Sequence, residues 1–122
     1  MSPNKRDIES IWDMVDAIVK IQEFTRTMEE EDYLNSELVQ SAVERKLEIL
    51  GEAARRLSTE FQAQNTEIDW RNAIGLRNMI IHRYDQVEQE RIWDITQEVL
   101  PELKNQLMPL LPPIVTETEN VE

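Results

Sequence analysis

The chain has 122 residues and a formal net charge of −12. Its length leaves room for one domain of ordinary size, and the absence of cysteine excludes a scaffold held by disulfides. Its two glycines stand alone, which excludes a glycine-rich loop that cradles phosphate with bare backbone. One histidine and no thiol exclude a structural zinc site. Only carboxylates remain as possible metal ligands, and they would suit a hard cation such as magnesium. We expect no metal and no cofactor.

Acidic residues are concentrated at the two ends of the chain. The overall charge argues against a protein that wraps nucleic acid, but residues 38–84 hold seven basic and six acidic residues. Within that block, the segment from Arg71 to Tyr84 carries three arginines and the single histidine with no carboxylate. If the protein contacts a phosphate, we expect the contact in this segment.

The first predicted element is a long amphipathic helix over residues 3–28, because apolar residues recur there at three- and four-residue spacing. The acidic run Glu29–Asp32 interrupts the pattern and favours a solvated connection over a metal site, since adjacent residues point around a helix. No apolar stretch near the start indicates a signal peptide or a membrane span, so a cytoplasmic protein is expected.

A second helix is predicted to start after Asn35 or Ser36, either of which can cap it, and to end between residues 58 and 64. Gly51, beside two alanines, marks a place where helices approach closely. The predicted inward positions are Leu38, Ala42, Leu47, Ile49, Leu50, Ala53, Ala54 and Leu57.

A third helix is predicted from Trp70, with Asp69 as its cap. A fourth apolar pattern follows, and Pro101 inside it predicts a kink or a break because proline lacks an amide hydrogen. Its predicted inward positions are Val87, Ile92, Ile95, Val99, Leu103 and Leu107. The expected fold is all-α, an antiparallel bundle of four or five helices forming a single domain over residues 1–108, with a flexible acidic tail over 109–122. The tryptophans at 12, 70 and 93 are expected in the core or at an interface.

The residues best suited to chemistry are Arg77, Asn78, His82 and Tyr84. Histidine can give and take a proton at neutral pH, and the arginine fork matches a phosphate. Cleavage of RNA by its own 2′-hydroxyl needs a base, an acid and a cation beside the phosphate, and it needs no metal.

One copy of the motif does not place all the groups that the reaction needs around one phosphate. Arg77 and His82 diverge by roughly 140° on an ideal helix, and a single histidine cannot be base and acid at once. A twofold homodimer could bring Arg77, Asn78 and His82 of both copies into one cleft. Arg77 could instead pair with Glu52 or Glu48 inside the bundle, as a structural residue.

The pattern of an arginine, four residues, a histidine, one residue and a tyrosine, carried here from Arg77 to Tyr84, resembles the HEPN superfamily and, within it, the HepT-like toxins of toxin–antitoxin pairs. Residues 47–57, 68–70 and 92–103 resemble the flanking segments of that family. The similarity covers roughly residues 5–108.

This resemblance implies an all-helical, metal-independent endoribonuclease that works as a homodimer and belongs to a type VII-like toxin–antitoxin system. Arg77 and His82 would be catalytic, and Asn78 would assist them. A cognate minimal nucleotidyltransferase antitoxin would transfer AMP onto Tyr84 and silence the toxin, because a nucleotide there adds negative charge and bulk where the RNA phosphate must sit. The alternatives are a noncatalytic helical module that binds a nucleotide or a partner, and a plain dimeric adaptor.

Overall fold

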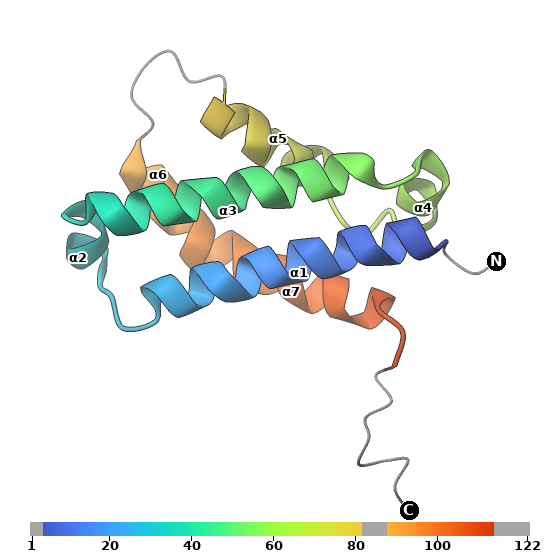
Figure 1. The fold of residues 1–122 in the computed structure, drawn as a ribbon, viewed down its shortest axis with the longest axis horizontal. Coiled ribbons are helices and arrows are strands. Elements are labelled where there is room, and N and C mark those ends of the chain that lie inside the picture. The colour runs from blue at the N-terminus through green and yellow to red at the C-terminus, as the bar shows by residue number, and fades with distance from the viewer. Residues whose placement is uncertain (1–3, 82–87, 114–122) are drawn as a thin grey trace, which may run out of the picture.

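Two long helices, α1 (Lys5–Thr25) and α3 (Glu37–Arg56), lie side by side and run in opposite directions in the computed structural model, which describes residues 4–81 and 88–113 (Figure 1). Each begins at a polar cap: the Asn4 side chain accepts a hydrogen bond from the Asp7 amide at 2.7 Å, and Ser36 accepts one from the Val39 amide at 3.2 Å. The prediction of a first helix over residues 3–28 was too long: α1 ends at Thr25, and the chain then turns.

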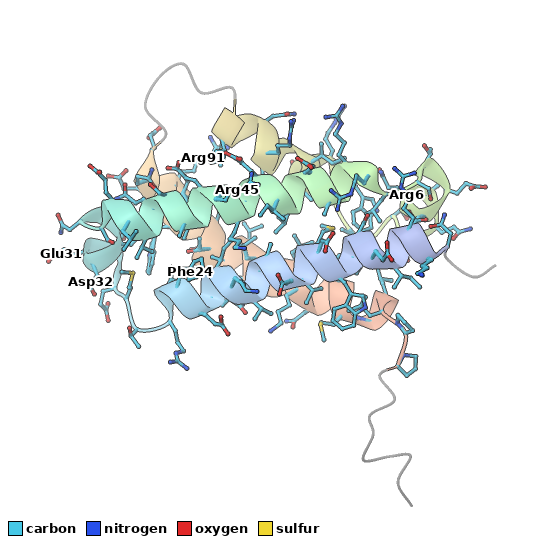
Figure 2. All side chains as sticks on the ribbon, in the orientation of Figure 1. Arg6, Phe24, Glu31, Asp32, Arg45 and Arg91 are labelled. Atoms are coloured by element: carbon cyan, nitrogen blue, oxygen red, sulfur yellow. The ribbon has the colours of Figure 1, made fainter. Side chains whose placement is uncertain are left out.

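The acidic run after α1 forms the start of a short helix, α2 (Glu30–Leu34), rather than a simple connection. The Asp32 carboxylate accepts a hydrogen bond from the Glu29 amide at 2.9 Å as part of a capping box, which explains why consecutive acids can begin a helix. Glu31 and Asp32 lie at one end of the bundle (Figure 2), and their side chains are exposed. The expectation that this run is solvated is confirmed.

The chain continues through α4 (Thr59–Gln64), capped by Ser58, to α5 (Trp70–Ile81), which packs against α3. The last segment contains α6 (Gln89–Asp94), a π-helical turn η1 (Ile95–Val99), α7 (Leu100–Leu107) and a short 3₁₀ turn η2 (Met108–Leu110). α7 packs against α1, so that α1 contacts both α3 and α7. No strand occurs in residues 4–81 and 88–113, and the predicted all-α class is confirmed.

The π-helical turn explains an error in the predicted inward face. Before Pro101, which lacks an amide hydrogen, the α-helical hydrogen-bond pattern changes to a π-helical turn in which the Leu100 amide bonds to the carbonyl of Ile95, five residues back. The helix is not broken into two pieces there. The extra residue shifts the register, so Thr96 is buried and Val99 is 47% exposed. The prediction that Val99 faces inward was wrong for this reason; Val87 lies outside the described residues.

Leu38 was also predicted inward but is 82% exposed. It lies five residues before Val43, hence about 140° away from the buried face of α3. Trp70 and Trp93 are buried as expected, while Trp12 is exposed. The fully buried side chains include Ile11, Met14, Ile18 and Ile21 of α1, Tyr33 of α2, Val43, Leu47 and Leu50 of α3, Ile92 of α6, and Leu100 and Leu107 of α7. Among the described residues, no helix is long and apolar enough to cross a membrane.

Candidate functional site

Helix α5 positions the predicted site residues, and its start is fixed by polar contacts. The Asp69 carboxylate accepts hydrogen bonds from the Asn72 amide at 3.1 Å and from the Asn72 side chain at 2.7 Å, as the predicted cap should. The Trp70 indole donates to the Asn65 carbonyl at 3.0 Å and its ring packs against Phe61. These contacts hold the first turn of the helix that carries Arg77.

Arg77 lies where α5 closely approaches Gly51 of α3. A Cβ atom added to Gly51 would lie 2.6 Å from both the Cβ and the backbone nitrogen of Arg77, so only glycine fits at that position. The predicted close approach at Gly51 is confirmed, and it fixes the backbone from which the Arg77 side chain extends.

The Arg77 side chain points along α3 to a carboxylate. Its Nε atom lies 3.7 Å from Oε2 of Glu52, and the side chain is 25% exposed. Glu48 instead pairs with Arg45 at 3.0 Å. Of the two acidic partners that the sequence left open, the structure therefore selects Glu52.

Nε of Arg77 is buried and has no hydrogen-bond partner, because 3.7 Å is an ion-pair distance and too long for a hydrogen bond. A buried donor without a partner is costly in a folded protein, and such atoms mark sites where a ligand or a rearrangement completes the contact. Since the guanidinium remains partly exposed, it is available to an anion from solvent.

Asn78, the next residue of α5, is exposed. His82 and Tyr84 lie outside the described residues, as does Asp85. Of the predicted constellation, the structure thus places Arg77 and Asn78, adjacent on one helix near its carboxyl end.

Helix α5 also borders a cleft of about 530 Å³ that the sequence did not predict. Leu76 and Met79 of α5 and Ile95 of η1 line it, with Arg91 among its polar residues. Arg91, labelled in Figure 2, belongs to α6. Helical spacing of apolar residues does not distinguish residues that line a cleft from residues of the core, so the sequence could not predict the cleft. The complete lining is Glu67, Asp69, Asn72, Ala73, Gly75, Leu76, Met79, Arg91, Ile95, Val99, Glu102, Leu103 and Gln106.

Among residues 4–81 and 88–113, no group of three or more histidine, cysteine, aspartate or glutamate side chains is arranged to hold a metal ion. The fold and the described site define an all-helical protein with a partly exposed arginine held between two packed helices. Arginine in this setting is a typical ligand for phosphate.

The chain belongs to the HepT-like ribonuclease family: the model of that family, described as "Ribonuclease HepT-like", matches residues 14–110. The protein named "Putative RNase MJ1380" of Methanocaldococcus jannaschii is 30% identical over 105 residues, which cover 85% of this chain and 96% of the relative. "Probable ribonuclease HepT" of Thermococcus cleftensis is 39% identical over 92 residues, covering 75% and 84%. No solved structure matches the chain significantly.

Proposed function

We propose that this protein is a metal-independent endoribonuclease of the cytoplasm and the toxin of a type VII-like toxin–antitoxin pair. The observation that carries the proposal is the partly exposed guanidinium of Arg77 in a chain of a ribonuclease family. Arg77 lies in the segment from residue 71 to residue 84, which contains no carboxylate. A fixed cation of this kind can stabilise the charge that develops on a phosphate during cleavage.

In the proposed reaction, a base takes the proton of the RNA 2′-hydroxyl, and that oxygen attacks the adjacent phosphorus. The bond from phosphorus to the 5′-oxygen breaks, and an acid gives that oxygen a proton. The products are a 2′,3′-cyclic phosphate and a free 5′-hydroxyl. His82 acts in proton transfer, Arg77 binds and stabilises the phosphate, and Asn78 helps to place it.

Base and acid act on opposite sides of the phosphate, whereas each chain has one histidine. We therefore propose a homodimer in which one protomer supplies the base and its partner the acid, with both copies of Arg77 and Asn78 around one RNA strand. The strongly acidic ends of the chain repel RNA, so binding depends on few arginines and weakens steeply with added salt.

A minimal nucleotidyltransferase partner would silence the enzyme by transferring AMP from ATP to the Tyr84 hydroxyl, which loses its proton as pyrophosphate is released. The structure supports this choice of tyrosine indirectly, because the chain has only two. The other, Tyr33, is fully buried and its hydroxyl donates a hydrogen bond to Gln89 at 2.8 Å. A transferase cannot reach that hydroxyl without unfolding the bundle.

The test of the nuclease is cleavage of total tRNA and of a generic single-stranded RNA in excess EDTA. The parent protein should cleave and leave cyclic phosphate ends, whereas His82→Ala and Arg77→Ala should lose at least about 100-fold in rate. Equal cleavage by all three proteins would reveal a contaminating nuclease, and binding of RNA without cleavage by the parent would favour a noncatalytic module.

The test of silencing is the mass of the protein after incubation with the partner and ATP. The parent should gain one or more AMP units, and Tyr84→Phe should gain none. Modification of the Tyr84→Phe protein would show that the acceptor is another residue.

A further inference from the structure

Glu52 lies between two arginines at the junction of α3 and α5. Its Oε2 atom is 3.7 Å from Nε of Arg77, and its Oε1 atom is 3.6 Å from Nη1 of Arg56. Arg56 in turn donates a hydrogen bond from Nη2 to Oδ2 of Asp13 at 2.8 Å. Four side chains of alternating charge thus connect α1, α3 and α5 and end at Arg77.

The position of Glu52 determines which edge of the Arg77 guanidinium is occupied. Nε faces Glu52 and is buried, and the remaining four N–H donors of an arginine are carried by Nη1 and Nη2. Within the part of the chain that the structure describes, Glu52 is the only ion-pair partner of Arg77. The pair of terminal nitrogens is therefore the edge that can bind a phosphate through two parallel hydrogen bonds.

The contact is poorly suited to stabilising the fold. The Glu52 side chain is 56% exposed, and an ion pair at 3.7 Å between partly solvated groups contributes little to folding. The ion pair has a greater effect on the orientation of the Arg77 side chain. Because the close contact with Gly51 already fixes the Arg77 backbone, the guanidinium can move only by rotation about its side-chain bonds. A carboxylate at Nε removes much of that freedom.

We propose that Glu52 is a positioning residue for RNA cleavage: it holds the Nε edge of Arg77 so that Nη1 and Nη2 meet the scissile phosphate. This inference rests on the proposed ribonuclease function. Arg56 and Arg77 balance the charges of Asp13 and Glu52, so the four side chains together carry no net charge beside the RNA backbone. When phosphate draws the guanidinium into place, the Nε–H group closes onto Oε2 and gains the hydrogen bond that it lacks.

The test compares Glu52→Ala and Glu52→Gln with a matched control, Glu48→Gln. Glu48 lies one turn earlier on α3 and pairs with Arg45, so the control removes the same charge from the same helix without touching Arg77. RNA cleavage is measured over a range of substrate concentrations in EDTA, and the folded fraction of each protein is checked by thermal melting.

For Glu52→Ala we expect kcat to fall roughly 10- to 100-fold with KM changed less than about threefold, because a misaligned cation costs most in the transition state. Glu52→Gln should recover part of the loss, since its amide oxygen can accept the hydrogen bond that Nε–H forms when phosphate binds, and Glu48→Gln should match the parent. In an Arg77→Ala background, Glu52→Ala should add no further loss. Unchanged or faster cleavage by Glu52→Ala would overturn the proposal, as would an equal loss in Glu48→Gln or a loss that only follows unfolding.

A second measurement does not depend on activity. The Nε–H cross peak of Arg77 in a ¹H–¹⁵N spectrum, assigned by its absence in Arg77→Lys, should be resolved in the parent and in Glu48→Gln. In Glu52→Ala it should shift and exchange with water at least about fivefold faster. If the peak is identical in all variants, Glu52 does not orient Arg77. If the peak depends on Glu52 while the parent cleaves no RNA, the orientation stands and the ribonuclease proposal fails.

Discussion

Gly51 of α3 and Arg77 of α5 are in such close contact that the two helices leave no room for a single methyl group between them. A Cβ atom at Gly51 would lie 2.6 Å from the backbone nitrogen of Arg77, and the obstacle is backbone that cannot swing aside. Glycine within a helix costs about 1 kcal/mol relative to alanine. That cost occurs at a helix contact that supports the candidate phosphate-binding arginine.

Gly51→Ala should therefore push α5 away from α3. We expect the free energy of unfolding to fall by about 1–3 kcal/mol, as for other overpacked interiors, and RNA cleavage to fall at least about tenfold as Arg77 moves. Urea unfolding and single-turnover cleavage measure the two effects.

Gly75→Ala is the matched control, since nothing lies within 4 Å of a Cβ atom there and the residue is also within a helix. It should raise the free energy of unfolding by about 0.5–1 kcal/mol. If both variants are stabilised, the contact between Gly51 and Arg77 is looser than the structure indicates.

Asp7 is a second position where one side chain joins distant parts of the chain. The residue is 3% exposed, and its carboxylate accepts hydrogen bonds from the amide and the hydroxyl of Ser58, both at 2.8 Å. Asp7→Ala would remove the charged acceptor of two hydrogen bonds from the half-buried Ser58, so we expect a loss of about 2–3 kcal/mol in the free energy of unfolding by urea. Asp16→Ala, which removes an exposed pair with Lys20, should change it by less than about 0.5 kcal/mol. Equal effects of the two changes would contradict the role of Asp7.

How far these features could be predicted depends on whether they are local. The buried faces of α1 and α3 follow from helical spacing, and the caps at Ser36 and Asp69 follow from residue type. The exposure of Val99 could not be predicted, because one extra residue in the π-helical turn shifts the helical register. No sequence pattern shows where that residue is inserted.

In the candidate site, too, the sequence predicts the local features but not those that depend on tertiary packing. Arg77 and Asn78 could be selected by chemistry and by resemblance, but the choice between Glu48 and Glu52 could not. The two acids lie one turn apart on the same helix, so only the packing of α5 against α3 decides which one meets Arg77. The cleft beside Leu76 and Met79 is a tertiary feature for the same reason.

Tyr33 predicts how stability depends on alkaline pH. Burial raises the pKa of its phenol above the ordinary value of about 10, and the negative charge of Glu44 adds to the effect. Because the folded state binds this proton more tightly than the unfolded state, the resulting stability is complete below pH 10 and is lost as the pH rises towards the folded-state pKa.

Comparison with Tyr33→Phe isolates this effect, since all other groups titrate alike in both proteins. At pH 8 the parent should be more stable by about 1 kcal/mol, for the hydrogen bond to Gln89, and by pH 11 that advantage should shrink by a similar amount. Urea unfolding at the two pH values measures it. A constant difference between the proteins would mean that the Tyr33 phenol ionises as it does in the unfolded chain.

The proposed sharing of one cleft by two protomers predicts how a mixed dimer behaves. If one His82 is the base and the other the acid, a heterodimer of parent and His82→Ala lacks one of two required groups, and its cleavage rate should fall at least about tenfold below the parent homodimer. The heterodimer is isolated by coexpression of two differently tagged chains and purification on both tags. A heterodimer of parent and Asp16→Ala, prepared in the same way, should retain the full rate because Asp16 forms only an exposed pair with Lys20. If the His82→Ala heterodimer keeps half of the parent rate, each protomer contains a complete site and the histidines are not shared.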